Sequence, residues 1–228
     1  MLKLVTHNIY EGGELPPFPS NVFYEFWLAE GGVYLRAKRT GLEVLMAVSR
    51  CEVRGLSDLQ PFVKLEYPPI PQELVAQTLE LSRQAKNERN RPVEKLFHLS
   101  FDERAWRWRL EVPEQVQTAG SVKPVDSGAG SSYERAVLEL HSHHSMSAFF
   151  SPTDDMDEAR SFRLFAVIGR IFQRAEIRVR VGVFGYFWQI DPELVLEMPA
   201  GLHDSSKLED EETRYDFFKE VYYDSTRA

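Results

Sequence analysis

Cysteine is almost absent from this chain, and so are long apolar stretches. Cys51 is the single cysteine in 228 residues, so a structural zinc site filled by cysteines cannot form. No apolar run approaches 18 residues, and no positively charged N-terminus precedes an apolar stretch. We therefore expect no membrane partner and a cytoplasmic location.

Positive charge is also scarce. The chain has 27 lysines and arginines against 35 aspartates and glutamates, a formal net charge of -8, and no clustered basic stripe. Nucleic-acid phosphates must be neutralised by Lys and Arg, so this composition argues against a nucleic-acid partner. The chain is 43% hydrophobic, which is enough for a substantial core in one large domain or two small ones.

The N-terminal part of the chain is rich in strand signals. Turn residues at Gly31-Gly32 and Thr40-Gly41 separate three β-prone segments, which predicts a three-stranded meander. The meander covers residues 23–29, 33–39 and 42–48, and a further strand is expected over residues 62–67. The stiff, proline-rich residues 67–71 cannot continue a sheet and form the best boundary.

That boundary divides the chain into a strand-rich N-terminal region (1–67), a catalytic part (68–200) and an acidic tail (201–228). In the tail we expect a helix over residues 208–222. In the catalytic part, an apolar stripe beginning after Pro71 predicts an amphipathic helix over residues 71–89.

The rest of the catalytic part predicts strands that surround a polar loop. Residues 96–101 should pair with residues 106–112 across a turn at 102–104, with Trp106 and Trp108 in the core. The polar, Gly/Ser-rich residues 113–132 predict a mobile loop. The expected elements that follow are a helix over 154–160 capped by Ser151 or Thr153, and strands over 162–168, 177–184 and 186–190.

The most informative segment is HSHHSMSAFFSPTD, residues 141–154. His141 and His143 follow the apolar run AVLEL and are two residues apart, which places both imidazoles on one strand face with Cα atoms roughly 6.6 Å apart. Asp154 lies beyond a turn at Ser151-Pro152-Thr153 and could direct its carboxylate back from the first turn of a helix. Three protein ligands with a water in the fourth position form a catalytic zinc site. A His-x-His pair alone more often marks only a polar strand end.

With Ser151 and Asp154 included, the segment resembles the JAMM motif of the JAB/MPN metalloproteases. Within that family it is most similar to the JAB-type proteins of the bacterial PRTRC gene cluster. The resemblance implies an α/β (α+β) fold, with a curved mixed β-sheet flanked by helices and the cleft at the edge of the histidine strand. It departs from the family in one place, because His144 stands where most members have proline. His144 could hydrogen-bond locally or contact substrate.

The family uses a glutamate upstream of the histidines as general base. Such a base must reach the zinc water from a strand beside the histidine strand. Glu94 fits, because Pro92-Val93-Glu94 follows the predicted helix and enters an apolar strand, as in many prokaryotic JAB proteins. The rival is Glu139, which shares the strand face of the histidines and could instead orient an imidazole.

The resemblance implies one zinc per chain, held by His141, His143 and Asp154. Glu94 would take a proton from the zinc water, and Ser151 would donate a hydrogen bond to the oxyanion. We expect a zinc metallopeptidase that acts on a ubiquitin-like protein or peptide tail in a bacterial modification system. Two alternatives stay open. One is a JAB-fold scaffold that binds a protein without turnover, and the other is a zinc amidohydrolase of unrelated fold.

Overall fold

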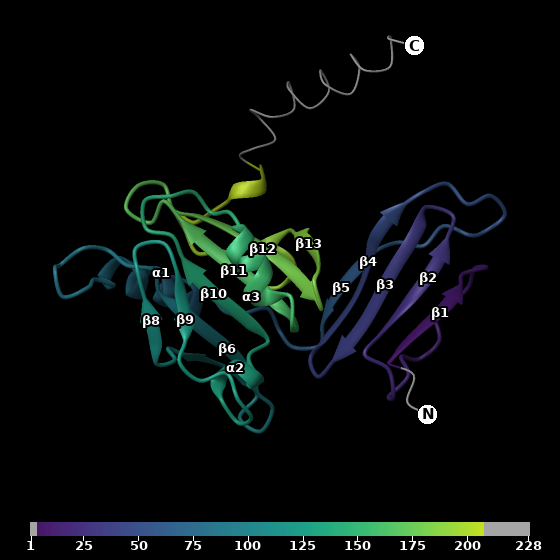
Figure 1. Ribbon diagram of the computed structural model, residues 1–228, viewed down its shortest axis with the longest axis horizontal. Coiled ribbons are helices and arrows are strands. Elements are labelled where there is room, and N and C mark those ends of the chain that lie inside the picture. Colours follow the sequence, from purple (N-terminus) through teal and green to yellow (C-terminus); the bar gives the residue numbers. More distant parts are fainter. Residues whose placement is uncertain (1–3, 208–228) are drawn as a thin grey trace, which may run out of the picture.

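The computed structural model describes residues 4–207, and its two large β-sheets lie side by side (Figure 1). The expected C-terminal helix over residues 208–222 lies outside the described residues. None of the helices within residues 4–207 has the length and apolar character needed to span a bilayer.

The N-terminal sheet contains five strands in the order β1-β2-β3-β4-β5. Their bounds are Val5–Ile9, Tyr24–Ala29, Gly32–Arg39, Leu42–Arg50 and Phe62–Leu65. The predicted meander is confirmed in β2, β3 and β4, and β5 ends two residues earlier than expected. The sequence analysis missed β1, which pairs with β2 in parallel. A short polar strand with no hairpin turn before its partner carries little local signal.

The second sheet is mixed and has seven strands, in the order β13-β12-β11-β10-β6-β7 with β14 also paired to β12. In chain order the strands are β6 Leu96–Asp102, β7 Arg107–Glu111, β10 Leu138–Ser142, β11 Phe162–Gly169, β12 Glu176–Val183, β13 Tyr186–Ile190 and β14 His203–Asp204. The histidine strand β10 is an interior strand, parallel to β11 and antiparallel to β6. The expected strand bounds in β6, β7 and β11 to β13 agree within one or two residues.

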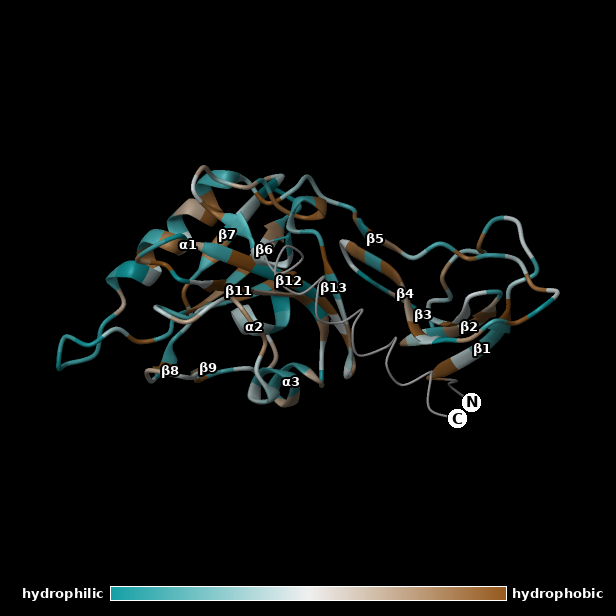
Figure 2. Cartoon of the chain, turned by 90° about the horizontal axis from the view of Figure 1, so that it is seen from above, coloured by the Kyte–Doolittle hydropathy of each residue, from teal (hydrophilic) through white to brown (hydrophobic). Residues whose placement is uncertain are grey.

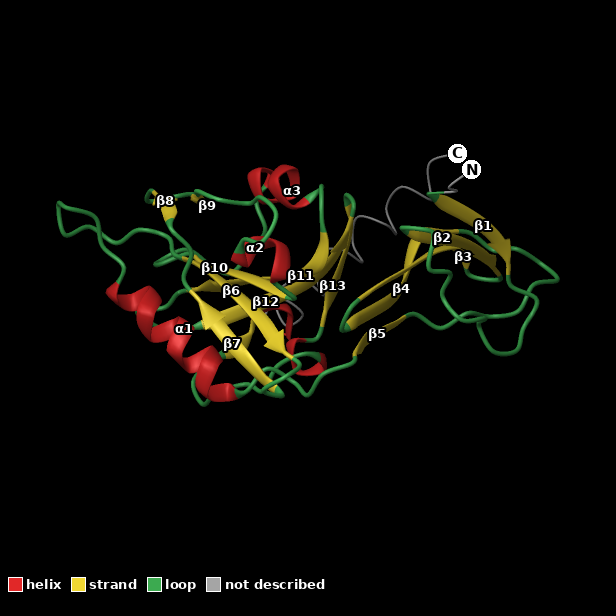
Figure 3. Cartoon of the chain, turned by 90° about the horizontal axis from the view of Figure 1, so that it is seen from below, coloured by secondary structure: helices red, strands yellow, loops and turns green. Residues whose placement is uncertain are grey.

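Short helices flank this sheet on both faces (Figure 3). Helix α1 (Gln72–Gln84) lies against one face, whereas α2 (Ser132–Arg135) and α3 (Pro152–Glu158) lie on the other. A single 3-10 turn, η1 (Pro192–Leu194), precedes β14. The mixed sheet with flanking helices confirms the α/β (α+β) class expected from the sequence.

Three local expectations were wrong. Helix α1 ends at Gln84 rather than Arg89, because the Asn87 side chain accepts the N–H groups of Arg89 and Arg91 and closes a turn. Trp106 is 64% exposed at a positive φ of 48° in the β6–β7 turn, so it is not a core residue, while Trp108 is buried as predicted. The supposed loop over residues 113–132 contains a two-stranded ribbon, β8 (Gln115–Gln117) and β9 (Val122–Pro124).

The two sheets share one hydrophobic core. Buried residues of β3 and β4, such as Leu35 and Val44, belong to the same cluster as those of β10 to β12. The Arg39 guanidinium also donates to the Phe162 carbonyl oxygen at 2.7 Å, which ties β3 to β11. Figure 2 shows the hydrophobic residues along the strands of both sheets and the polar residues on the loop after α1. The five-stranded sheet is therefore joined to the seven-stranded sheet through a common core.

Candidate metal centre and catalytic glutamate

Three side chains that can ligate a metal meet at the C-terminal end of β10. His141 lies in β10, His143 directly follows it, and Asp154 comes from the first turn of α3. The two histidine Nε2 atoms are 3.3 Å apart, and His141 Nε2 is 3.6 Å from Asp154 Oδ1. One ligand atom from each residue lies within 4.8 Å of the others. The structure thus brings together the three residues selected by spacing, at the end of an interior strand rather than at a sheet edge.

Both imidazoles are held in the form that binds metal. His141 and His143 are buried, and burial is the main reason that their pKa values fall, to about 4 for His141. At neutral pH both rings are therefore neutral, as metal ligation requires. The Ser147 carbonyl oxygen lies 3.1 Å from His143 Nδ1 and can accept a hydrogen bond from the Nδ1–H group. This leaves Nε2 as the atom that can bind a metal.

The loop after the histidines packs closely against Gly169 in β11. A Cβ atom at Gly169 would lie 2.3 Å from the Ala148 nitrogen and 2.4 Å from the Ser147 carbonyl carbon, so only glycine allows this approach. The buried Glu176 carboxylate also accepts the Ala148 N–H at 2.8 Å. These contacts set the position of the carbonyl that orients His143.

Asp154 is placed by the N-terminal cap of α3. The Ser151 hydroxyl accepts the Asp154 N–H, and Asp154 Oδ2 accepts from both the Ser151 N–H (2.6 Å) and the Ser151 hydroxyl (2.7 Å). This capping box leaves Oδ1 turned toward His141. The expected cap by Ser151 is confirmed, but the helix begins at Pro152 rather than Asp154.

Arg180 of β12 anchors α3 to the sheet. Its guanidinium lies 3.9 Å from the ring centroids of both Phe150 and Phe187 and is buried between them. Arg180 Nε donates to Glu158 at 2.8 Å and Nη1 donates to Asp155 at 2.6 Å. Both acceptors follow Asp154 in α3, so the buried cation fixes the helix that carries the third candidate ligand. The sequence analysis did not identify Arg180, which lies in a strand selected only for its apolar residues.

Glu94 lies next to this cluster, as the sequence predicts for the base. Its Oε1 is 3.7 Å from His143 Nε2, and that oxygen is buried without a hydrogen-bond partner. Burial, and then the charge of Asp154, raise the pKa of Glu94 to about 7. A carboxylate with this pKa can both accept and return a proton near neutrality.

The β8–β9 ribbon fixes the backbone of Glu94. The Glu94 N–H donates to the Thr118 carbonyl at 3.0 Å, and the Gln117 amide donates to the Glu94 carbonyl at 2.6 Å. Gln115 likewise bonds to the backbone of Leu96. Residues 115–118 therefore hold the backbone of Glu94, a role that the sequence did not indicate for this segment.

Glu139 does not contact the imidazoles of the metal cluster in the described residues. Its Oε2 lies 3.5 Å from His98 Nε2 and 3.5 Å from Arg163 Nη1. His98 is fully buried, and its Nδ1 is 2.8 Å from the Ser132 hydroxyl at the start of α2. Glu139 shares the face of His141, as predicted, but it belongs to a polar network that joins α2 to the sheet.

His144, in place of the common proline, directly follows the candidate ligand His143. Its carbonyl accepts the Ile171 N–H at 2.9 Å, while its ring Nε2 is buried without a hydrogen-bond partner. The backbone contact with Ile171 holds the exit from the strand. Within residues 4–207 the His144 ring makes no such local hydrogen bond, and a contact with substrate stays a prediction.

The cluster opens into a small cavity of about 200 Å³. Glu94, Ser151 and the three ligands line it, together with the ribbon residues Gly120 to Lys123. Phe149 packs edge-on to His143, with centroids 4.8 Å apart, and Met146 adds a second apolar wall. The sequence analysis missed Phe149 and Met146, although both are apolar residues inside the motif.

A comparison with protein families decides which fold carries this cluster. Residues 76–182 match the family described as prokaryotic homologs of the JAB domain. These residues form a JAB domain. The JAB domain includes Glu94 and the whole 141–154 segment, and its family includes peptidases and isopeptidases. The match does not single out the PRTRC subgroup, which stays a prediction, and no curated protein matches the chain.

Proposed function

We propose that this JAB domain is a zinc-dependent JAMM-type peptidase or isopeptidase. The observation that carries the proposal is the unpaired, buried Oε1 of Glu94, which lies 3.7 Å from His143 Nε2 beside the three ligand atoms. A buried carboxylate oxygen with no partner is costly, so its retention indicates a functional role. A scaffold that only binds protein would have no need of it.

The donor set fits zinc. Two neutral imidazole nitrogens and one carboxylate oxygen leave a fourth position open, as in catalytic zinc sites. In such a position zinc acts as a Lewis acid and lowers the pKa of a water toward neutrality. His141, His143 and Asp154 would hold the ion, one per chain.

The other side chains of this site transfer protons, stabilise the oxyanion and exclude water. Glu94 is the general base that accepts the proton of the attacking water and then delivers it to the leaving amine. Ser151 is the donor to the oxyanion. Its hydroxyl now donates to Asp154 Oδ2, but that oxygen keeps the Ser151 N–H as a second donor when the hydroxyl turns away. The apolar Phe149 and Met146 limit the entry of bulk water.

The narrow cavity favours an extended tail with small residues as substrate. A volume of about 200 Å³ is below that of pockets for drug-sized ligands. Within residues 4–207, β9 pairs only with β8, so its outer edge is available to an added strand beside the cavity. We therefore propose a Gly-terminated ubiquitin-like protein, or its conjugates, as the substrate in a bacterial modification system, in line with the JAB/MPN family that the motif resembles.

The test is cleavage of a ubiquitin-like fusion that ends in Gly before a reporter. The zinc-loaded protein should cut after the terminal Gly, a chelator should abolish cleavage, and a bulky residue in place of Gly should reduce it strongly. Equal cleavage of the Gly and bulky fusions would contradict the proposed substrate. Cleavage that persists with chelator would contradict the metal mechanism. Binding of the fusion without turnover would indicate a scaffold.

The contribution of the ribbon segment to substrate binding can be tested by a deletion, but a deletion of all of residues 115–131 would be too large. That deletion would remove Gln117 and Thr118, which hold the Glu94 backbone, and would affect the chemical step as well as binding. Removal of residues 126–130 alone spares both strands of the ribbon. Residues 126–130 directly follow β9, whose Val122 and Lys123 line the cavity, so we expect this shorter deletion to shift that wall and change KM more than kcat.

A further inference from the structure

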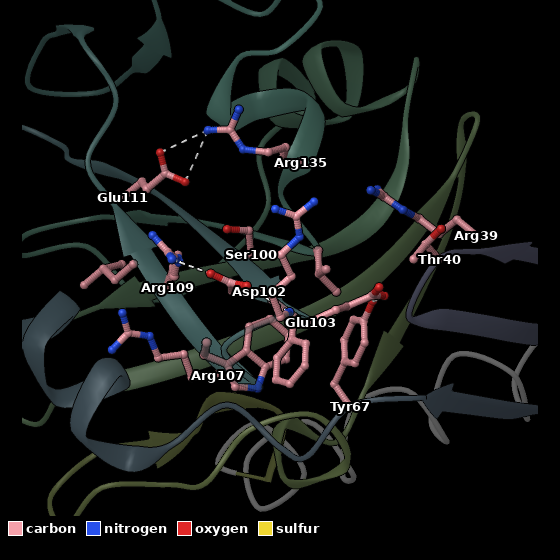
Figure 4. A pocket seen from close by; sticks show the side chains of 15 residues that line it. Arg39, Thr40, Tyr67, Ser100, Asp102, Glu103, Arg107, Arg109, Glu111 and Arg135 are labelled. Atoms are coloured by element: carbon pink, nitrogen blue, oxygen red, sulfur yellow. Dashed lines mark hydrogen bonds and ion pairs between the residues drawn. The ribbon is translucent and has the colours of Figure 1, made fainter.

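A second, larger cavity lies where the five-stranded sheet meets the JAB domain. It has a volume of about 1000 Å³ and combines the turn after β3, Tyr67, the β6–β7 hairpin and the end of α2 (Figure 4). Tyr67 stacks on Phe101 at a centroid distance of 4.1 Å, and Trp108 packs edge-on against both rings. These rigid aromatic contacts form one wall. Both sheets contribute residues to the cavity, which gives the N-terminal region a part in binding.

The lining of this cavity is positive although the chain is acidic. The chain has a formal net charge of -8. The cavity is lined by five basic residues and three acidic ones. They are Arg39, Arg104, Arg107, Arg109 and Arg135, with Asp102, Glu103 and Glu111. A surplus of two positive charges in a half-enclosed space attracts anions.

The three carboxylates of the cavity already have partners. Arg109 pairs with Asp102, and the Tyr67 hydroxyl donates to Glu103 at 2.7 Å. Arg135 lies 3.3 Å from Glu111. Two of the five arginines are therefore paired, and the charge of Glu103, whose partner Tyr67 is neutral, offsets one of the other three and leaves the surplus of two.

Three arginines have no carboxylate partner. The guanidinium groups of Arg104 and Arg107 make no ion pair or hydrogen bond within the part of the chain that the structure describes, and Arg107 extends freely in Figure 4. Arg39 donates only to carbonyl oxygens, at 2.7 Å to Phe162 and 3.5 Å to Glu134. Guanidinium groups suit carboxylates, because their planar N–H groups match two oxygens at once.

The charged side of the cavity lies on the same face of the sheet as the candidate metal centre, whereas Phe101 and Trp108 of its aromatic wall point to the other face. His141 pairs with Leu96, and Asp102 pairs with Arg107. Paired residues share a face and residues two apart along a strand share it too, so Asp102 and Arg107 lie on the face of His141. Leu96 and Asp102 are six residues apart, which is about 20 Å along β6.

A small folded protein can reach both places. A domain of 70 to 100 residues has a radius of gyration of about 11–13 Å, so it can extend over 20 Å of this face. We propose that the arginine-lined cavity is an exosite, a second binding surface that holds an acidic segment of the protein whose tail enters the metal centre. The inference rests on the proposed function for its substrate, but the binding of carboxylates does not depend on catalysis.

The first experiment measures binding without turnover. A fluorescein-labelled hexaglutamate peptide is titrated with the full chain in chelator, and anisotropy is read at low and raised salt. We expect saturable, salt-sensitive binding, weakened about tenfold or more by Arg104→Glu with Arg107→Glu, since each such contact contributes up to about 1 kcal/mol. The matched control is Arg89→Glu with Arg91→Glu, which makes the same charge change in the exposed turn after α1.

The control pair should bind the peptide within about twofold of the unchanged chain, because its arginines line no part of the cavity. Equal losses in the two pairs, or no saturable binding by the unchanged chain, would overturn the exosite. Inorganic tripolyphosphate is the competitor. If it binds at the arginines and the peptide does not displace it, the site accepts small phosphates and the proposal is wrong.

The second experiment links the cavity to the substrate. With an acidic ubiquitin-like fusion and a short tail peptide as paired substrates, the Arg104/Arg107 double variant should lower the fusion-to-peptide ratio of kcat/KM about tenfold. An unchanged ratio with active enzyme overturns the exosite and leaves the peptidase assignment intact. If neither substrate is cut, the proposed function fails and the peptide-binding experiment alone decides the cavity.

Discussion

Glu94 Oε1 lies 3.7 Å from His143 Nε2, and both side chains are buried. The carboxylate comes from the segment before β6 and the imidazole from the end of β10, two neighbouring strands joined through the Leu96–His141 pair. Burial, and then the charge of Asp154, raise the pKa of Glu94 to about 7, and no hydrogen-bond donor to this oxygen counteracts the rise. This relationship makes the metal-free protein sensitive to pH.

Glu94 should destabilise the metal-free protein at alkaline pH. The pKa of Glu94 is about 7 in the folded chain and 4.5 for an unperturbed glutamate. Between these pH values the folded state binds a proton that the unfolded state has lost, so the free energy of unfolding falls as pH rises from about 4.5 through 7. Glu94→Gln removes this loss, and we expect it to be more stable than the unchanged chain at pH 8 by roughly 1–2 kcal/mol, with little difference at pH 4. Urea unfolding in chelator at both pH values measures this. An advantage that is the same at both pH values would contradict the assigned pKa.

Zinc content should depend on the three ligands. We expect about one zinc per chain, lost in His143→Ala because two ligands seldom hold zinc tightly. His7→Ala, which removes an exposed histidine of β1, should retain the metal. Elemental analysis of dialysed protein measures this, and full zinc in His143→Ala would refute the ligand set.

A side chain at Gly169 should loosen the metal centre without touching it. Gly169→Ala pushes a methyl group into the backbone at Ser147 and Ala148, so the carbonyl that orients His143 must move. We expect weaker zinc binding, by about tenfold or more as for other outer-shell changes, in a protein that still folds. The control Gly128→Ala lies in the exposed loop before α2. If Gly169→Ala and Gly128→Ala have the same zinc dissociation constant, the packing of Gly169 against the loop does not contribute to zinc binding.

Removal of Arg180 should cost far more stability than removal of the whole ion pair. Arg180→Met leaves Glu158 buried without its partner, a loss of about 3–5 kcal/mol. Burial raises the pKa of Glu158 to about 8, so without Arg180 this carboxyl is unpaired and costly to ionise. Adding Glu158→Gln to Arg180→Met removes the unpaired acid and should recover part of that loss. Urea unfolding of the single and double variants measures the recovery. Additive losses would mean that the two groups do not act as a pair.

The sequence predicted the elements whose signals are local. The meander followed from its turn residues, and the pairing of β6 with β7 followed from alternation around a short turn. The β8–β9 ribbon was missed because its strands have three residues each and are held by bonds to residues 94–96. Trp106 was assigned to the core by alternation, but the turn backbone directs it to solvent.

The same division applies to the site. His141, His143 and Asp154 share one segment, so their spacing predicts that they meet. Glu94 was found because the family resemblance limited where a base could lie. Arg180 and Gly169 were not found from the sequence. Arg180 acts through its contact with α3, and Gly169 acts through its contact with the loop after β10, and no local sequence pattern indicates either contact.

The most direct test of the account is the turnover of Glu94→Gln with its zinc content verified. The amide cannot accept a proton, so the variant should fold and retain about one zinc per chain while losing at least about a hundredfold in kcat on a Gly-terminated ubiquitin-like fusion. Glu139→Gln, which alters the His98 network instead, should keep most of the activity. Full activity in zinc-loaded Glu94→Gln, with loss in Glu139→Gln, would contradict the assignment of Glu94 as the base.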